Sequence, residues 1–257
     1  MSVKPKKHLG QHFLTNQAIA GSIVGSLSEK GYSKVLEIGP GMGVLTDHLI
    51  QRSFETHLIE LDAESVDYLK LKYPELAERI IFADFLKFDL RSYFSSEFAL
   101  IGNFPYNISS QIVFKMLSFK ANIPELCGMF QKEVAERITA SEGSKKYGIL
   151  SVLTQAFYDA EYLFSVLPNE FNPPPKVNSG VIRLIRKPVY TLDFDEKIFF
   201  KLVKTAFNQR RKMLRSSLKS LGFPEQLTRS DLFSMRPEQL SVSQFINLSL
   251  NLVDEKP

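Results

Sequence analysis

Residues 34–43 read Lys-Val-Leu-Glu-Ile-Gly-Pro-Gly-Met-Gly, a short apolar run followed directly by three glycines at alternate positions. The run from Lys34 to Ile38 is typical of a strand that is covered on both faces of a parallel sheet. The glycines allow the backbone to turn tightly and to approach a ligand without a Cβ in the way. Their spacing is G-x-G-x-G, whereas a dinucleotide fingerprint would require a further glycine at Val44. The stretch therefore predicts a strand, a ligand-binding loop and a helix at the start of an α/β sheet.

The same alternation of buried strands and helices continues along the chain. Strand patterns follow at Thr56–Leu61, Arg79–Ala83, Phe98–Gly102, Leu126–Gln131 and Ser179–Arg186, with a weaker one at Tyr162–Leu167. Helical patterns occur at Asn16–Ser28, Val44–Arg52 and Ala63–Leu71, and Asn16 is the expected N-cap of the first. We therefore predict an α/β, Rossmann-like domain with a mostly parallel sheet.

The pattern changes after Lys187-Pro188. Beyond this point the sequence predicts only helices, over Glu196–Leu221, near Ser230 and over Ser241–Leu252. We therefore predict two domains, an α/β domain over residues 1–188 with a basic N-terminal arm and a small all-α domain over residues 189–257.

Acidic residues end the second and third predicted strands. Glu60 follows Gly43 by seventeen residues, and Asp84 lies at the end of the next strand. Ligands of open α/β sheets bind beyond the carboxyl ends of the strands, where both side chains should lie. Glu60 could accept hydrogen bonds from a ribose diol, and Asp84 is placed to accept them from an adenine amino group. Both nicotinamide and S-adenosylmethionine cofactors present a ribose diol, and the altered glycine spacing favours S-adenosylmethionine.

The fourth predicted strand ends in Asn103-Phe104-Pro105-Tyr106. The lone pair of an exocyclic amine is delocalised into its ring, so methylation requires acceptors that hold the nitrogen toward tetrahedral geometry and stabilise the developing charge. The Asn103 side-chain oxygen and the Phe104 carbonyl can serve, Pro105 stiffens the backbone, and Tyr106 can stack on a base taken out of its helix. As an isolated string, the motif is equally typical of a turn. Its place at a strand end beside the glycine loop favours a catalytic site.

The net charge of +4 is unevenly distributed. Residues 1–28, 173–190 and 200–223 together hold fourteen lysines and arginines and no acid, so the rest of the chain carries a net charge of −10. Such runs are often solvated helix faces, but their clustering in three segments favours a nucleic-acid partner. We expect phosphate contacts at Lys6, Lys7, Lys176, Arg211, Lys212 and Arg215. Arg210 falls on the apolar stripe of its predicted helix, which indicates a bend there or a buried ion pair.

Composition excludes several classes of protein. The chain is 44% hydrophobic and 23% charged, in the ordinary globular range. No stretch approaches the ~20 apolar residues of a membrane span, and the basic N-terminus lacks the apolar core of a signal peptide. The single cysteine, Cys127, excludes an intrachain disulfide and a cysteine metal cluster, and its position predicts a small buried side chain within a strand. We therefore expect a cytoplasmic monomer that needs no metal ion and no membrane.

Seven motifs resemble the ribosomal RNA adenine N6-dimethyltransferase family over nearly the whole chain. They are Gly10–Leu14, Glu37–Gly41, Ile59–Asp62, Gly102–Ser109, Gln131–Val134, Pro173–Val177 and Ala206–Lys212. The resemblance implies a class I methyltransferase fold and S-adenosylmethionine as the methyl donor. It also implies dimethylation of two adjacent adenosines near the 3′ end of 16S rRNA, within the assembling small ribosomal subunit.

Carried over by position, the resemblance implies a set of site residues. The cofactor contacts would be His12, Leu14, Gly39, Glu60, Asp84 and Asn103. Phe171 would sandwich the target adenine against Tyr106. The chain departs from the family pattern at His12, where Asn is usual, and at Phe104, where Leu or Ile is usual.

Two other functions remain as alternatives. One is the 23S rRNA adenine methyltransferase of the macrolide-resistance type, which shares the glycine loop and the N-x-P-Y motif. The segments Phe171–Val177 and Ala206–Lys212 favour the small-subunit type. The other is a non-catalytic RNA-binding assembly factor on the same fold, against which Glu60, Asp84 and the complete Asn103–Tyr106 motif argue.

Overall fold

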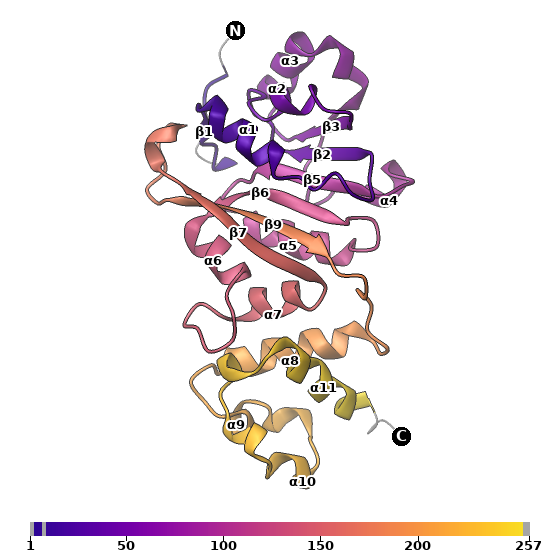
Figure 1. The fold of residues 1–257 in the computed structure, drawn as a ribbon, viewed down its shortest axis with the longest axis vertical. Coiled ribbons are helices and arrows are strands. Elements are labelled where there is room, and N and C mark those ends of the chain that lie inside the picture. The colour runs from indigo at the N-terminus through magenta and orange to yellow at the C-terminus, as the bar shows by residue number, and fades with distance from the viewer. Residues whose placement is uncertain (1–2, 7–8, 254–257) are drawn as a thin grey trace. The chain divides into compact units, whose positions relative to one another are not determined.

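A seven-stranded, mostly parallel sheet organises the first part of the chain (Figure 1). The computed structural model describes residues 3–6 and 9–253. The strands are β2 (Lys34–Ile38), β3 (Glu55–Glu60), β4 (Ile80–Phe82), β5 (Phe98–Asn103), β6 (Glu125–Gln131), β7 (Tyr158–Val166) and β9 (Ser179–Arg186). Their order is β4-β3-β2-β5-β6-β9-β7. β2 to β6 pair in parallel, and β9 pairs antiparallel with β6.

The strand order reverses direction at β2, whose neighbours are β3 on one side and β5 on the other. In open α/β sheets such a reversal leaves a crevice at the carboxyl ends of the strands, because the connecting segments diverge to opposite sides. β1 (Phe13–Leu14) and β8 (Phe171–Asn172) form a separate antiparallel pair, with Leu14 opposite Phe171. The crevice therefore lies between the glycine loop after β2 and the Asn103 motif at the end of β5.

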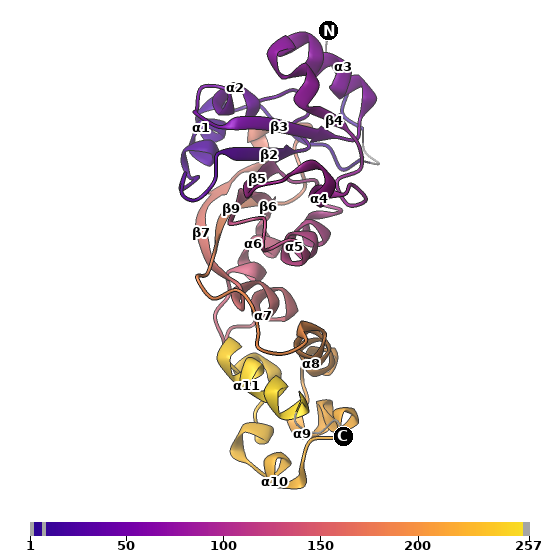
Figure 2. The same ribbon diagram turned by 90° about the vertical axis from the view of Figure 1, so that its right-hand side faces the viewer.

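Helices cover both faces of the sheet. They are α1 (Gln17–Gly25), α2 (Thr46–Leu49), α3 (Ala63–Lys72), α4 (Leu90–Tyr93) and α5 (Ser109–Ser118). Figure 2 shows α1 and α2 on one side of the strands and α5 on the other. Asn16 caps α1 as predicted, because its side-chain oxygen accepts from the backbone N–H groups of Ala18 and Ile19 at 2.9 and 3.2 Å. Cys127 is buried in a core cluster between α1 and the sheet, also as predicted.

The chain divides into two compact units, and the division differs from the predicted boundary in one respect. The first unit contains the residues up to Ala135 and Asp159–Arg186, whereas Glu136–Tyr158 and the chain from Lys187 onward form the second. The sequence places residues 136–158 in the first domain, because the predicted boundary follows the change in pattern after Lys187-Pro188. The predicted α/β fold with a helical C-terminal part is confirmed. No helix within residues 3–6 and 9–253 has the length and apolar character that crossing a membrane requires.

The second unit consists of helices, joined by short 3-10 turns. The helices are α6 (Lys132–Ile138, which begins in the first unit), α7 (Ile149–Gln155), α8 (Glu196–Asn208), α9 (Leu214–Ser217), α10 (Glu225–Thr228) and α11 (Val242–Val253). Within the part of the chain that the structure describes, 3-10 turns lie at Pro74–Arg79 and Pro168–Glu170 in the first unit and at Lys219–Leu221, Asp231–Ser234 and Pro237–Gln239 in the second. The apolar side of α8, with Phe199, Leu202 and Val203, is buried.

The prediction of one helix over Glu196–Leu221 is wrong, because α8 ends at Asn208. A continuous helix would place Arg210 on the apolar stripe. Instead the chain turns after Asn208, and the Arg210 guanidinium donates to the carbonyl of Ser144 at 3.3 Å and lies 3.8 Å from Glu238. Of the two alternatives that the sequence indicates, the bend is present, whereas the ion pair is not buried, because the Arg210 side chain is 38% exposed. α2 is also shorter than its predicted span, beginning at Thr46 rather than Val44.

Candidate active site

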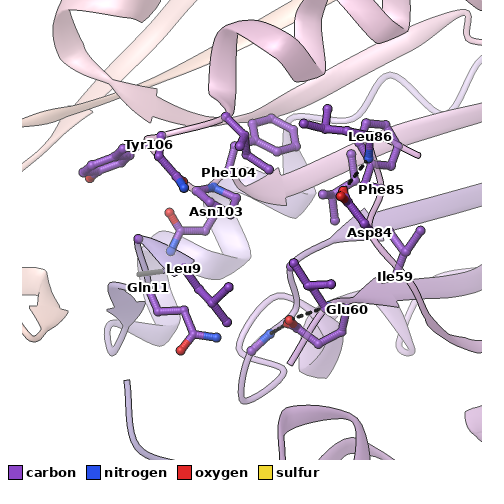
Figure 3. A pocket seen from close by; sticks show the side chains of 18 of the residues that line it. Leu9, Gln11, Ile59, Glu60, Asp84, Phe85, Leu86, Asn103, Phe104 and Tyr106 are labelled. Atoms are coloured by element: carbon purple, nitrogen blue, oxygen red, sulfur yellow. Dashed lines mark hydrogen bonds between the residues drawn. The ribbon is translucent and has the colours of Figure 1, made fainter. Parts of the chain in front are cut away.

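A cavity of about 160 Å³ lies at the carboxyl ends of β2, β3 and β5 (Figure 3). It is lined by Leu9–Phe13, Ile38, Gly39, Gly41, Ile59–Leu61, Ala83–Leu86 and Asn103–Ile108. These segments are far apart in the sequence, and the sheet brings together their ends. The cavity therefore contains the glycine loop, both predicted acidic residues and the Asn103–Tyr106 motif.

The glycine loop has the backbone that the sequence predicts. Gly39, Gly41 and Gly43 have φ angles of +67°, +56° and +78°, which side chains with a Cβ rarely adopt. Glu37, buried in β2, accepts a hydrogen bond of 2.6 Å from the Thr46 hydroxyl and so links the two ends of the loop. The pKa of Glu37 is raised to about 8, mainly by burial and to a lesser extent by the nearby Glu60 carboxylate, while the hydrogen bond from Thr46 acts in the opposite direction.

Glu60 is held by backbone hydrogen bonds at the base of the cavity. One carboxylate oxygen accepts from Gly41 N at 3.1 Å, and the other accepts from Leu61 N at 2.8 Å and Asp62 N at 2.9 Å. Burial raises the pKa of Glu60, while these three N–H groups act in the opposite direction. A carboxylate has about four acceptor positions, so one remains on the oxygen that faces Gly41.

Asp84 lies on the opposite wall of the cavity. Its Oδ1 accepts from Leu86 N at 2.9 Å, and its Oδ2 lies 3.9 Å from the ammonium of the exposed Lys87. The Asp84 carbonyl accepts from the N–H groups of Lys87 and Phe88, at 3.0 and 2.9 Å. The aspartate therefore sits within a tight turn, with one oxygen committed to the backbone.

Asn103 projects into the cavity from the end of β5 (Figure 3). Its Nδ2 donates to the carbonyl of His12 at 2.8 Å. Since the amide nitrogen is the donor, this bond fixes the orientation of the side chain and leaves Oδ1 as the acceptor. The backbone of residue 12, rather than its imidazole, therefore sets the position of Asn103.

The Phe104 ring fills space that two glycines leave open. A Cβ on Gly102 would lie 2.9 Å from the ring, and one on Gly128 of the neighbouring strand would lie 2.5 Å from it. The ring is buried and also packs against Phe130, with centroids 4.8 Å apart. The bulkier side chain at this position is thus packed into the space beside the two glycines, which keeps the backbone of the motif in place.

Tyr106 is fixed at both ends. Its hydroxyl lies 2.5 Å from the Ser179 hydroxyl, and its ring stacks on the His12 ring at a centroid distance of 5.5 Å. His12 Nδ1 lies 2.8 Å from the carbonyl oxygen of Pro173, which can only accept, so Nδ1 carries the proton. The departure at His12 therefore places an aromatic ring against the predicted stacking tyrosine.

Two predicted site residues are not brought into the cavity. Phe171 is 4% exposed and packs in the core cluster that also contains Leu14. Leu14 lines a smaller neighbouring cavity of about 30 Å³, together with Glu37, Gly39 and Asn103. Gly39 and Asn103 line both cavities, so Leu14 is adjacent to the predicted site without reaching its main space.

The N-terminal arm forms one wall of the cavity. The Lys6 ammonium forms an ion pair with Asp62 and lies 3.2 Å from Glu64, and Lys6 N donates to Gln11 Oε1 at 2.8 Å. The hydrogen bond with Asp62 raises the pKa of Lys6. Lys6 therefore holds the arm that carries Leu9–Phe13, in addition to any contact with phosphate. Lys7 lies outside the described residues.

The other predicted phosphate contacts lie on the surface. Lys176 is exposed in the first unit, in the loop before β9. In the second unit, Arg211 and Lys212 are exposed in the turn after α8, and Arg215 is exposed on α9. The Arg215 guanidinium donates to the hydroxyl of Ser234 and to the Phe233 carbonyl. The turn and the start of α9 therefore present three cations within five residues.

The strand order and the glycine loop define a Rossmann-like, class I methyltransferase, and solved structures agree. The dimethyladenosine transferase from Plasmodium falciparum has a TM-score of 0.80 at 26% identity, covering 95% of this chain and 97% of that one. The 23S rRNA methyltransferase ErmE has a TM-score of 0.71 at 25% identity, covering 94% and 99%.

Residues 2–253 match the family described as Ribosomal RNA adenine dimethylase, and the chain belongs to this family of enzymes. A relative from Flavobacterium johnsoniae, "Ribosomal RNA small subunit methyltransferase A", is 60% identical over 248 residues, 96% of this chain and 95% of the relative. A relative of the same name from Cytophaga hutchinsonii is 55% identical over 249 residues, 96% of each chain. The resemblance found in the sequence is thereby confirmed.

Three residues with evident roles in the site were not singled out from the sequence. Glu37 is an acid inside an otherwise apolar strand, and an acid at such a position could have marked it as a site residue. Gln11 lines the cavity and receives the hydrogen bond from Lys6 N, but nothing in the local pattern distinguishes it. Lys115 contacts the Asp84 turn from α5, a pairing thirty residues apart that no local pattern reveals.

Proposed function

We propose that this chain transfers methyl groups from S-adenosylmethionine to N6 of two adjacent adenosines near the 3′ end of 16S rRNA, two to each adenosine. The observation that carries the proposal is the single cavity that joins Glu60 and Asp84 to Asn103–Tyr106. The names of relatives that are 52–60% identical support the small-subunit substrate. A substrate within the assembling small subunit would place the enzyme in the cytoplasm, and we expect a monomer that uses no metal ion.

The residues of the cavity fit S-adenosylmethionine. The remaining acceptor position of Glu60 suits a ribose hydroxyl, and Asp84 Oδ2 suits the adenine amino group. Gly39 and Gly41 expose backbone close to the cavity without a Cβ. When bound, this cofactor would supply an electrophilic methyl group. His12 would contribute to the cofactor site through its backbone carbonyl, which positions Asn103. Leu14 would contribute as part of the wall behind Gly39.

The Asn103 motif would hold the target nitrogen. Asn103 Oδ1 and the Phe104 carbonyl would accept its two N–H groups and favour the geometry in which the lone pair points at the methyl group. The developing positive charge would be stabilised by the same two oxygens. Pro105 and the buried Phe104 ring keep this backbone rigid. No strong base is required, because the methylated nitrogen is acidic and loses its proton afterwards.

Base stacking would use Tyr106, whose ring is already oriented by His12 and Ser179. One face of the tyrosine is stacked on His12, so the adenine would approach the other. Phe171 remains a proposed second stacking partner, and because it is buried in the core cluster, its ring would have to turn out of that cluster to contact the base.

Exposed cations would bind the phosphates of the RNA. Lys176, Arg211, Lys212 and Arg215 are proposed phosphate contacts, and Lys6 and Lys7 of the arm are retained from the sequence analysis. Reversing Arg211, Lys212 and Arg215 to Glu should weaken RNA binding and flatten its dependence on salt, because fewer counterions are released. Filter binding at several salt concentrations measures this slope, and an unchanged slope would place the phosphate contacts elsewhere.

The decisive experiment uses labelled S-adenosylmethionine with unmethylated small subunits, large subunits and the two naked rRNAs. We expect dimethyladenosine in 16S rRNA only, located by mass spectrometry. Label confined to 23S rRNA would support the macrolide-resistance type, and no label in any substrate would support a non-catalytic assembly factor. Asn103→Ala should abolish turnover while sparing RNA binding, and an active Asn103→Ala enzyme would contradict the assigned role.

A further inference from the structure

Lys115 of α5 binds the turn that carries Asp84. Its ammonium donates to the carbonyl of Phe85, and to the carbonyl of Phe88 at 2.6 Å. The same ammonium lies 4.9 Å from the centroid of the Phe85 ring and 5.7 Å from that of Phe119. A half-buried lysine that bridges two carbonyls forms charge-assisted bonds, which are stronger than those between neutral groups. Lys115 thus holds two backbone positions of one short turn.

Two features anchor this turn besides Lys115: Ala83 N donates to the Glu60 carbonyl at 3.0 Å, and the Phe85 side chain is buried. The turn follows the edge strand β4, which pairs only with β3. Within the turn, the backbone N–H groups of Leu86, Lys87 and Phe88 all donate to Asp84, either to Oδ1 or to the carbonyl oxygen. These bonds close the turn on itself but do not tie it to the rest of the sheet. The bonds from Lys115 connect it to α5, whose apolar side is buried.

α5 also begins at the other wall of the cavity. The cavity is lined up to Ile108, which is the N-cap of this helix, and Lys115 follows two turns later. At 1.5 Å per residue, the seven residues span about 10 Å. One helix therefore connects the Asn103–Ile108 segment, proposed to hold the target adenosine, with the turn proposed to bind the cofactor's adenine.

We propose that Lys115 is a positioning residue for the adenine end of the cofactor site, which it secures by fixing the turn so that the Asp84 carboxylate faces the adenine amino group. The proposal rests on the function proposed above, since it requires Asp84 to read that amino group. Lys115 itself does not line the cavity and touches neither proposed substrate. Its effect should therefore be seen in how well the site distinguishes adenine from a base without the amino group.

The test compares two ligands on the full chain. S-adenosylhomocysteine presents the adenine amino group, and S-inosylhomocysteine presents a ring carbonyl that the Asp84 carboxylate would repel. The Kd of each is measured by calorimetry on the wild type and on Lys115→Met, Lys115→Arg and Lys87→Met. Lys87→Met is the matched control, because it removes a positive charge beside Asp84 from an exposed side chain with no bond to the two carbonyls.

We expect the wild type to prefer S-adenosylhomocysteine, and Lys115→Met to lose about tenfold of that preference, the size of one hydrogen bond to a charged group. Lys115→Arg should keep most of the preference, because guanidinium can reach both carbonyls, and Lys87→Met should keep nearly all of it. A general loss of stability would weaken both ligands alike and leave their ratio unchanged.

Each other outcome overturns a defined part of the reasoning. An unchanged ratio in Lys115→Met refutes the role of Lys115 and leaves the proposed function intact. An equal loss in Lys87→Met shows that charge, not support of the turn, is responsible. A wild type that binds S-adenosylhomocysteine without discrimination refutes the role of Asp84, and one that binds neither ligand refutes the proposed function. If Lys115→Met does not fold, the ratio of the two Kd values is measured on Lys115→Gln instead. This variant keeps a hydrogen-bond donor but cannot reach both carbonyls, so an unchanged ratio refutes the role of Lys115.

Discussion

Glu37 should make the stability of the fold depend strongly on pH. Its carboxyl is buried in β2, and its pKa in the folded protein is raised from 4.5 to about 8. Between these values the folded chain keeps the proton and the unfolded chain releases it. The stabilising contribution is therefore complete below about pH 4.5, declines as the pH rises, and is lost above about pH 8. At about 1.4 kcal/mol per pH unit, this interval corresponds to an upper limit of about 5 kcal/mol.

Glu37→Gln removes this dependence without changing the shape of the side chain. The amide resembles the protonated acid, and its oxygen can still accept the hydrogen bond from Thr46. Urea denaturation from pH 5 to pH 9 gives the free energy of unfolding of both proteins at each pH. We expect Glu37→Gln to gain on the wild type by about 3–4 kcal/mol between pH 5 and pH 8, a large part of a typical total stability.

Other titrating groups are present in both proteins, so their contributions cancel in the difference. Glu75→Gln is the matched control, because it makes the same chemical change at an exposed position of the first unit. Its difference from the wild type should be flat over the same range. Parallel curves for Glu37→Gln and the wild type would show that Glu37 is ionised in the folded protein at neutral pH, and would refute the reasoning from burial.

Three further changes test the cavity. Gly128→Ala would place a Cβ 2.4 Å from the Gly102 carbonyl oxygen and 2.5 Å from the Phe104 ring, so the free energy of unfolding in urea should fall by about 1–3 kcal/mol, and an unchanged value would contradict the packing described. Glu60→Gln loses the charge and one acceptor oxygen, which should raise the Kd for S-adenosylhomocysteine by roughly 10- to 100-fold in calorimetry. Lys6→Met should raise the same Kd by breaking the attachment of the arm, whereas Lys4→Met, an equal loss of charge in the same arm, should leave it unchanged.

The sequence predicted best those parts of the site that depend on strand ends. The glycine loop, Glu60, Asp84 and Asn103 each lie at or just beyond the carboxyl end of a strand, and the geometry of a parallel sheet brings such positions together whatever the helices do. Contacts between distant segments were not predictable in this way. The bond from Asn103 to the His12 carbonyl joins residues 91 positions apart and involves backbone, so no side-chain pattern encodes it.

Helices were predicted less accurately than strands: one was missed and another was predicted too long. α5 was not predicted, although Ile112, Val113 and Met116 form a buried stripe, because its first turn follows directly from the Asn103 motif without a capping side chain. The long helix predicted through Arg210 failed for the opposite reason. A favourable periodic pattern continued past Asn208, but burying an arginine in the apolar stripe costs more than ending the helix and pairing the guanidinium. Periodicity describes one face of a helix and does not weigh that cost.

The structure also divides the positive charge into two groups that the sequence counted together. Lys6, Arg183, Arg186 and Arg210 form ion pairs with acids of their own unit, so their charge is already largely balanced and they would release few counterions on binding RNA. The exposed cations after α8 are different, because Arg211 and Lys212 lie in a turn where the chain has left the helix. The same break that keeps Arg210 out of the apolar core therefore brings the next two charges to the surface. The end of α8 thus serves packing and also exposes the cations proposed to bind RNA, so the salt dependence of binding should reflect these exposed cations rather than all fourteen.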